Sequence, residues 1–265
     1  MLNRLLGLGR KKSPAGPPQL RAYAVGDVHG RLDLLEDLIC RIERDNAARS
    51  PAKTFIIFLG DLVDRGPDSR GVVDYLLRFQ PRFANTVFLK GNHEEFLLRV
   101  LSGDERVVTD WLTYGGYECA DSYGVTKGWT LNATPTEIVR RLQDAVPEEH
   151  RCFLEGMADT FRFGDYFFVH AGVRPGVPLG EQSASDLRWI RDDFLESRAN
   201  HGLVIVHGHT VVQRPEEHPN RIAVDTGAYK SGVLTALGLE GTGRWFIQAH
   251  EGVAPRESRS TALAS

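Results

Sequence analysis

Short apolar runs alternate with polar turns and amphipathic segments through the first hundred residues. Apolar runs at 21–25, 54–59 and 86–90 are each followed by a turn that contains Gly together with Asp or Asn. The segment from Leu32 to about Ala47 then repeats apolar residues at helical spacing, and a similar segment follows each of the other two turns. The repeated order of strand, turn and helix predicts parallel strands with helices packed against them.

The pattern changes in the second half of the chain. Residues from about 103 to 158 are rich in charge, glycine and aromatic side chains, with a predicted helix at 135–145. From Asp159 onward, short apolar runs dominate again, broken by a helical segment near 185–197. We therefore predict an α/β fold in which a second sheet packs on the first, with a helical insertion at about 103–158.

Composition and charge set limits on the class of protein. The chain has 265 residues, 42% of them hydrophobic, which fits one domain at 21–255 between a mobile, basic and Pro-rich tail at 1–20 and a disordered tail at 256–265. The formal net charge of -3 argues against general nucleic-acid binding. No apolar run has the length of a membrane span, and the three Cys lack CxxC spacing. We expect a cytoplasmic monomer with reduced thiols and no stable membrane association.

Unusual polar residues lie where the apolar runs end. In α/β sheets, the carboxyl ends of parallel strands are where binding sites are assembled. The side chains there offer carboxylate, imidazole and amide ligands, a set that suits Mn²⁺, Fe or Zn²⁺ and not a thiolate-bound metal. The residues at these ends are Asp27, His29, Asp61, Asp64, Arg65, Asn92, His93, His170, His207 and His209.

Five short motifs in fixed order carry a family resemblance. They are GDVHGR at 26–31, GDLVDRGPDS at 60–69, GNHE at 91–94, HAGV at 170–173 and HGHT at 207–210. A lone GDxHG is a weak signal, whereas GDxxDRGPxS together with GNHE is very specific. The series resembles the calcineurin-like metallophosphoesterases, and most closely the phosphoprotein phosphatase branch with its bacterial and phage serine/threonine phosphatases. The resemblance implies a four-layer α/β/β/α sandwich of two mixed sheets flanked by helices.

The resemblance also implies two divalent metal ions, most simply Mn²⁺, with Fe or Zn²⁺ as alternatives. A hydroxide between two cations forms near neutral pH and would attack phosphorus in line, without a covalent phosphoenzyme. Asp61 would belong to both metal sites. By the family pattern, Asp27, His29 and Asp61 would hold the first ion, and Asp61, Asn92, His170 and His209 the second.

Further residues match the family's catalytic and phosphate-binding positions. His93 would be the general acid for the leaving alkoxide, and Asp64 would orient it and keep it protonated. Arg65 would bind phosphate oxygens through its forked donors, together with Asn92. The string LRWIRDDFL at 187–195 resembles the family's Trp-x-Arg block, which favours Arg191 over Arg188 as a second phosphate-binding arginine.

Several residues keep a second interpretation. His207 and His209 lie two positions apart, and the GHT block favours His209 as the ligand, with His207 in the core or behind the ligands. Asp225, at another strand end, either hydrogen-bonds a ligating histidine or starts a turn. Arg174 lies near HAGV and is equally well explained as a solvated loop residue. The remaining histidines carry no motif, and we expect them on the surface: His150, His201, His218 and His250.

Three functions compete. The first is a protein serine/threonine phosphatase, acting on a phosphorylated protein or peptide. The second is a symmetrical bis(5'-nucleosyl)-tetraphosphatase acting on a dinucleoside polyphosphate; such relatives tend to read GNHD where this chain reads GNHE. The third is an inactive scaffold of the same fold, which the complete ligand set disfavours.

The insertion is a candidate for substrate selection because it begins after the GNHE segment and ends before the strand that leads to His170. Its aromatic side chains either form a local core or wall one side of the metal cleft. They are Trp111, Tyr114, Tyr117, Tyr123 and Trp129.

Overall fold

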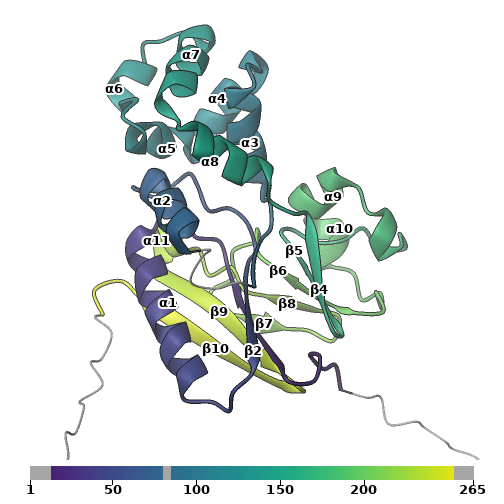
Figure 1. Cartoon of the computed structure of the whole chain (residues 1–265). Helices are drawn as coiled ribbons and strands as arrows, with labels where there is room; N and C mark the ends of the chain where they lie inside the picture. Colours follow the sequence, from purple (N-terminus) through teal and green to yellow (C-terminus); the bar gives the residue numbers. More distant parts are fainter. Residues whose placement is uncertain (1–12, 80–84, 254–265) are drawn as a thin grey trace, which may run out of the picture.

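Two five-stranded sheets form the centre of the protein, with helices on their outer faces, as the computed structural model in Figure 1 shows. The structure describes residues 13–79 and 85–253. Residues 1–12 of the predicted tail at 1–20, and all of the predicted tail at 256–265, lie outside the described residues. The strand orders are β10-β9-β1-β2-β3 and β4-β5-β6-β8-β7.

The first sheet follows from the period of two along its strands. In β1 (Leu20–Val25), Tyr23 and Val25 face one hydrophobic cluster, while Ala22 and Ala24 face another that includes the second sheet. This cluster between the sheets also contains Phe168. The other elements of this half are α1 (Leu32–Ala47), β2 (Lys53–Phe58), α2 (Ser69–Phe79), β3 (Thr86–Phe88) and α3 (Asn92–Leu101).

Parallel pairing joins β1 to β2 and β2 to β3, as the repeated strand–turn–helix order predicted. Helix α1 buries Leu34, Leu35 and Leu38 on one face, toward the sheet. The helix covers β9 and β10 of this sheet in Figure 1. The carboxyl ends of β1, β2 and β3 therefore reach the same edge of the sheet.

The second sheet has the same two-faced pattern. In β5 (Tyr166–Val169), Tyr166 and Phe168 face the first sheet, whereas Phe167 and Val169 pack outward against a cluster that contains Phe194. Helices on both outer faces with two sheets between them give the predicted four layers. The remaining elements are β4 (Thr160–Phe163), η4 (Leu179–Glu181), α9 (Ala184–Trp189), α10 (Asp192–Leu195), β6 (Val204–His207), β7 (Glu216–Glu217), β8 (Arg221–Ala223) and α11 (Ala228–Ser231).

The sequence pattern predicted that all strands after Asp159 would join the second sheet, but the last two strands do not. Strands β9 (Val233–Glu240) and β10 (Gly243–His250) leave the second sheet and join the first, with β9 antiparallel to β1. The interior of β9 is buried throughout, because the strand lies between β1 and β10. A run of apolar residues alone does not say which sheet a strand will enter.

The insertion forms a helical body above the sheets, at the top of Figure 1. It begins after α3 and returns to the sheets at β4. Among the described residues, no helix combines the length and the apolar character needed to cross a bilayer. The insertion contains η2 (Glu105–Val107), α4 (Val108–Trp111), η3 (Leu112–Gly116), α5 (Tyr117–Ser122), α6 (Lys127–Thr130), α7 (Pro135–Ala145) and α8 (Glu148–Glu155).

Two local expectations need correction. His150 is buried and not on the surface; its ring nitrogens lie 2.9 Å from the Tyr123 hydroxyl and 3.2 Å from an Asp74 carboxylate oxygen. Residues near Ala15, which we expected in the mobile tail, contact both sheets. The amide of Ala15 donates to Asp165 at 3.0 Å, and the amide of Gly16 donates to the carbonyl of Gly241 at 2.8 Å.

Candidate metal centre

Side chains from both sheets meet at the carboxyl ends of the strands. Asp27 and His29 follow β1, and Asp61 follows β2. The helix after β3 begins with Asn92 and His93. The turns after β5 and β6 add further imidazoles. We call the set of loops after β1, β2, β3, β5 and β6 the sheet rim, and its buried ligand-type side chains are Asp27, His29, Asp61, Asn92, His93, His170 and His209.

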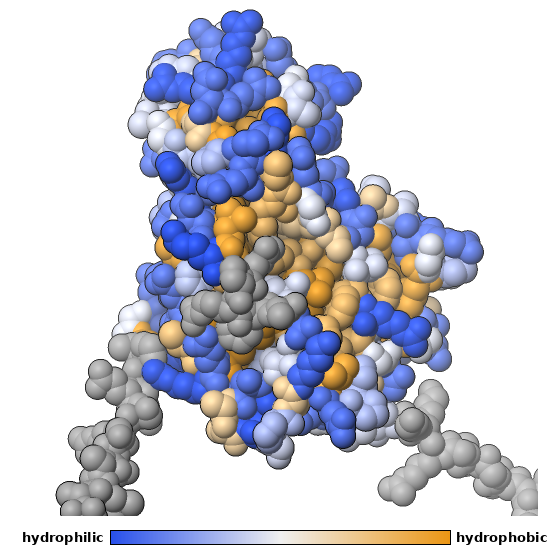
Figure 2. Space-filling model, viewed as in Figure 1, coloured by the Kyte–Doolittle hydropathy of each residue, from blue (hydrophilic) through white to orange (hydrophobic). Residues whose placement is uncertain are grey.

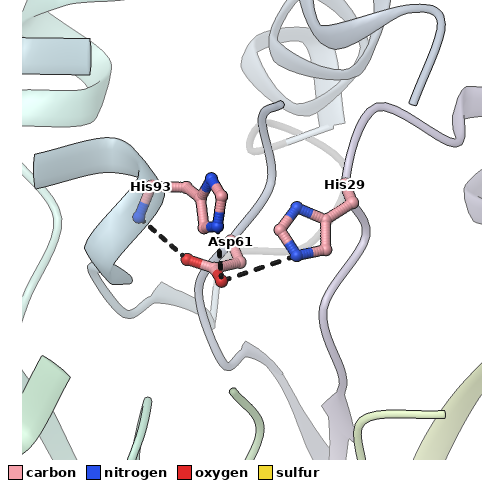
Figure 3. A group of neighbouring side chains, drawn as sticks. All are labelled: His29, Asp61 and His93. Atoms are coloured by element: carbon pink, nitrogen blue, oxygen red, sulfur yellow. Dashed lines mark hydrogen bonds and ion pairs between the residues drawn. The ribbon is translucent and has the colours of Figure 1, made fainter. Parts of the chain in front are cut away.

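Asp61 lies at the centre of this set. Figure 3 shows its carboxylate between the rings of His29 and His93. The Oδ2 atom of Asp61 lies 3.5 Å from Nε2 of His29 and 3.9 Å from Nε2 of His93. Its Oδ1 atom lies 3.4 Å from Nε2 of His170. One carboxylate therefore faces histidines on two sides.

A second group forms on the Oδ1 side of Asp61. Nε2 of His170 lies 3.0 Å from Oδ1 of Asn92 and 3.2 Å from Nδ1 of His209. The amide of His209 donates to Oδ2 of Asp27 at 2.9 Å, which ties the two groups together. Among the residues that the structure describes, two groups of side chains could hold a metal ion, and they share Asp61: His29, Asp61 and His93, and Asp61, His170 and His209.

The site passes a simple test for bound cations. Oδ1 of Asp27, Nε2 of His29 and Nε2 of His209 are buried, and none of them has a hydrogen-bond partner among the described residues. Leaving such atoms unpaired is costly in the absence of a ligand. Burial lowers the pKa of His29 and of His209, so both imidazoles are held neutral, as ligation requires.

The carboxylates fit the same test. Burial, followed by the nearby charges of Asp225 and Asp61, raises the pKa of Asp27. Burial acts in the same direction on Asp61, but positive charge beside it, from His170 first and then His93, outweighs burial and lowers the Asp61 pKa. A cation bound beside Asp27 would stabilise its ionised carboxylate, since nearby positive charge favours the ionised form.

Several ligand-type residues have a left-handed backbone. Residues other than glycine rarely adopt positive φ, and each residue held in that conformation destabilises the folded state by of order 1–3 kcal/mol. Such residues cluster at functional sites when the surrounding structure holds them in place. The rim residues in this conformation are His29 (46°), Asp61 (50°), Asp64 (70°), Arg65 (67°) and His209 (62°).

Glu94 fixes the loop that carries these residues. Its buried carboxylate accepts hydrogen bonds from the amides of Gly91 at 2.8 Å, Asp61 at 2.9 Å and Leu62 at 2.7 Å. A side chain on Gly91 would collide with Asp61 Oδ1, so the backbone must pass close to the ligand. The Glu of GNHE therefore organises the loop and does not face substrate, which weakens its use as a substrate discriminator.

The predicted acid and its partner form a buried pair. Nδ1 of His93 lies 2.7 Å from Oδ2 of Asp64. Burial lowers the pKa of His93, but the charges of Asp61 and Asp64 outweigh it and raise that pKa. The same carboxylate accepts a hydrogen bond from the indole of Trp111, in the insertion. Trp111 had no local motif to mark it as part of this site.

The two predicted arginines lie at the edges of the site. The half-buried Arg65 places its guanidinium carbon 4.8 Å from the ring centroid of Tyr229. Burial lowers the pKa of His170, and the charges of His93 and of the exposed Arg191 act in the same direction. Arg188 instead pairs with Glu95 at 3.2 Å and with Asp159. Arg188 is thus held in ion pairs, whereas Arg191 is exposed.

The residues with two interpretations are placed as follows. His207 is buried with its ring centroid 5.1 Å from that of Phe194, whereas His209 reaches His170. Oδ1 of Asp225 accepts from the amide of Gly227 at 2.7 Å, which is a turn contact. Arg174 is exposed and pairs with acidic side chains of α9 and α10.

A surface hollow of about 580 Å³ lies away from these residues. It is lined by parts of α2, β3 and α8 and by the segment after α8, including Leu77, Phe88 and Met157. Figure 2 shows apolar residues gathered on this face, at the junction between the insertion and the sheets, while the insertion itself is mostly hydrophilic. None of the rim residues lines this hollow.

Comparison with known proteins adds the family. The sequence profile of the calcineurin-like phosphoesterases matches residues 20–236. An asymmetrical bis(5'-nucleosyl)-tetraphosphatase from Anoxybacillus flavithermus is 27% identical over 234 residues, covering 80% of this chain and 88% of the relative. Serine/threonine-protein phosphatase 1 from Salmonella typhimurium is 28% identical over 230 residues, covering 82% and 91%.

A solved structure supports the same fold. The crystal structure of a putative diadenosine tetraphosphatase superposes with a TM-score of 0.60 at 20% identity, covering 91% of this chain and all of that one. The relatives carry two different substrate names, so they agree on the chemistry and not on the substrate. The profile match spans most of the chain and includes all the rim residues, and the chain therefore belongs to the calcineurin-like phosphoesterase family of metal-dependent hydrolases.

Proposed function

We propose that this protein hydrolyses phosphomonoesters at a centre that holds two divalent cations. The observation that carries the proposal is the Asp61 carboxylate, which belongs to both histidine clusters. A shared carboxylate with imidazoles on each side suits two neighbouring ions. Asp27, His29 and Asp61 would hold one cation, and Asp61, Asn92, His170 and His209 the other.

Bound cations would polarise phosphate oxygens and lower the pKa of a water molecule. Their ligands combine carboxylate, imidazole and amide groups, which supports Mn²⁺, with Fe or Zn²⁺ as alternatives. His29 Nδ1 lies 2.9 Å from the carbonyl of Val63, and His170 Nδ1 lies 2.9 Å from the carbonyl of Leu59. These contacts fix which nitrogen of each ring is free for the metal.

The other rim residues would bind phosphate and supply a proton. Arg65, Arg191 and Asn92 would bind phosphate oxygens, since they lie around the two clusters with N–H donors. His93 would donate its Nε2 proton to the leaving oxygen, while Asp64 accepts the Nδ1 proton in a hydrogen bond. A ligating histidine bonded to a carboxylate has the same appearance, so the role of His93 needs a direct test.

For the substrate, we propose a phosphorylated serine or threonine in a protein or peptide. The surroundings of the site support it, because Arg191 and Tyr114 are both exposed and leave room for a macromolecule to approach. The Salmonella relative carries the corresponding name. We propose a cytoplasmic monomer that needs no nucleic acid or membrane for this activity.

A dinucleoside tetraphosphate is the second candidate. The Anoxybacillus relative favours it by name. Two tyrosines near Arg65 offer ring faces for a nucleobase: Tyr229 by the guanidinium, and Tyr114, whose carbonyl accepts from Nε of Arg65 at 3.4 Å. The symmetrical cleavage that the sequence analysis kept as an alternative would give two nucleoside diphosphates, and asymmetrical cleavage a triphosphate and a monophosphate.

One paired assay separates these candidates. Rates on a phosphoserine or phosphothreonine peptide and on diadenosine tetraphosphate are measured side by side with added Mn²⁺, and the nucleotide products are identified. We expect the larger kcat/KM on the phosphopeptide. A higher value on the dinucleotide would replace the proposed substrate, and failure to hydrolyse either substrate or para-nitrophenyl phosphate would return the inactive scaffold to consideration.

A further inference from the structure

The insertion reaches the buried pair of His93 and Asp64 through two buried side chains, the indole of Trp111 and the thiol of Cys119. Trp111, at the end of α4, is fully buried. Its indole Nε1 lies 3.1 Å from both Oδ1 and Oδ2 of Asp64. An ionised carboxylate only accepts hydrogen bonds, and here it accepts from the indole on one side and from His93 on the other.

The insertion holds the same loop at a second point. The carbonyl of Gly115 accepts from the amide of Arg65 at 3.0 Å. Gly115 has φ of 117°, and a side chain there would collide with Arg65. Asp64 and Arg65 are consecutive residues with left-handed backbone. The insertion therefore contacts both strained residues, one through its carboxylate and the other through its amide.

These contacts bear on the direction of the His93 ring. With Nδ1 bonded to Asp64, only Nε2 of His93 faces Asp61 and the metal clusters. The ring can point there only while the Asp64 carboxylate keeps its orientation. The indole N–H restrains that carboxylate, and the burial of all three groups makes each hydrogen bond stronger than it would be in water.

We propose that Trp111 is a positioning residue for the proton-donating histidine: its indole holds the Asp64 carboxylate, which in turn holds His93 in line with the leaving oxygen. This inference rests on the proposed role of His93 as the general acid. Trp111 transfers no proton itself. The proton moves from Nε2 of His93 to the leaving oxygen as the P–O bond breaks. The insertion thus contributes to the chemical step as well as to the surface around it.

The kinetic test uses Trp111→Phe, which keeps an aromatic ring and removes the N–H. We expect kcat to fall about 10-fold to 100-fold on an alkyl phosphate, the range expected for losing a hydrogen bond to a charged group. The fall should stay under about 3-fold on 4-nitrophenyl phosphate, whose leaving group needs little protonation. KM should change little on either ester.

The matched control is Tyr123→Phe, which removes another buried hydrogen bond inside the same insertion, to His150. Both variants are checked for metal content and thermal unfolding. The control should leave the ratio of alkyl to aryl rates unchanged. An equal change of that ratio in both variants would show a general loosening of the insertion and would overturn the proposal.

A double-mutant cycle separates positioning from structure. In a His93→Asn background the acid is gone, so adding Trp111→Phe should cost nothing further on the alkyl ester. Additive losses would overturn the role of Trp111 while leaving His93 as the acid. If His93→Asn alone shows no dependence on the leaving group, the role of His93 fails, and the inference fails with it.

A measurement that does not depend on activity completes the test. The indole N–H signal of Trp111, assigned by its absence in Trp111→Phe, is followed by ¹⁵N NMR in the full-length protein. We expect slow exchange with solvent and a clear shift of that signal in Asp64→Asn. The control is Glu95→Gln, whose carboxylate oxygen lies 3.3 Å from the indole nitrogen of Trp189, and which should move only that second signal. An unchanged Trp111 signal in Asp64→Asn would overturn the proposal.

Discussion

The sheet rim presents its ligands through short loops whose motifs can be read in the sequence, whereas the insertion reaches the same site through contacts that no motif marks. These contacts come from the side chains of Trp111 and Cys119 and from the backbone carbonyls of Tyr114 and Gly115. In the rim, backbone carbonyls at and after the end of β2 hold the rings of His29 and His170. The contacts from the insertion instead reach the rim from a separate helical body, as the indole of Trp111 does when it bonds Asp64. The rim therefore determines which chemistry is available, and the insertion adjusts how well one part of it is aligned.

The largest expected effect tests the rim itself. Asp61→Asn removes the carboxylate shared by both clusters, so metal content should fall and kcat should drop about 10³-fold or more, since metals supply several kcal/mol of charge stabilisation. Metal analysis and turnover of para-nitrophenyl phosphate measure the two effects. A variant with two metals per chain and near-normal turnover would contradict the central role of Asp61.

His93→Asn sharpens the comparison because it shows whether His93 acts as a metal ligand or as the general acid. We expect metal content to be kept and kcat on an alkyl ester to fall about 10²- to 10⁴-fold, with a smaller loss on an aryl ester. Metal analysis and the two rates are compared in the same preparation. Loss of metal would place His93 among the ligands, as its position in one of the clusters also allows.

Glu94→Gln tests whether metal binding at the rim depends on the hydrogen bonds between the Glu94 carboxylate and the rim backbone. The substitution replaces a carboxylate that accepts from several buried amides with a group that carries its own donors. We expect metal affinity to weaken about 10- to 100-fold, as for other residues behind metal ligands. Titration of the metal-free protein with Mn²⁺ measures it, with the exposed Glu149→Gln of the insertion as the control. Equal affinities in the two variants would refute the scaffold role.

The smallest effect belongs to the outer surface of the insertion. Tyr114 is 54% exposed, and its ring stacks on Phe96 with centroids 6.1 Å apart. Tyr114→Ala should change KM on a phosphopeptide or dinucleotide about 2- to 10-fold, the range for one aromatic contact. Metal content and turnover of small esters should stay nearly the same. An unchanged substrate ranking would remove Tyr114 from any role in specificity.

Sequence reasoning was most successful where function depends on local chain geometry. The strand ends with Asp27, Asp61 and His170 were predicted because a strand, a tight turn and a ligand follow one another directly. The joining of β9 and β10 to the first sheet was not predicted, because strand pairing is a long-range choice between two similar apolar surfaces.

Two residues show where the sequence could and could not have helped. The burial of His150 could have been predicted, since His150, Phe153 and Leu154 share the i, i+3 and i+4 spacing of one buried helix face. The contact of Trp111 with Asp64 had no such signal. It depends on how the insertion folds back over the rim, and Trp111 looked like any aromatic residue of a local core, which it also is.

The left-handed backbone of Asp64 and Arg65 has a consequence for protein engineering. Glycine adopts this conformation without the cost that other residues carry, so replacing Arg65 by Gly is expected to raise the free energy of unfolding by about 1 kcal/mol while removing the proposed phosphate contact. Selection for melting temperature alone would therefore favour inactive variants in this loop. A thermostabilisation campaign on this enzyme needs an activity screen at every round.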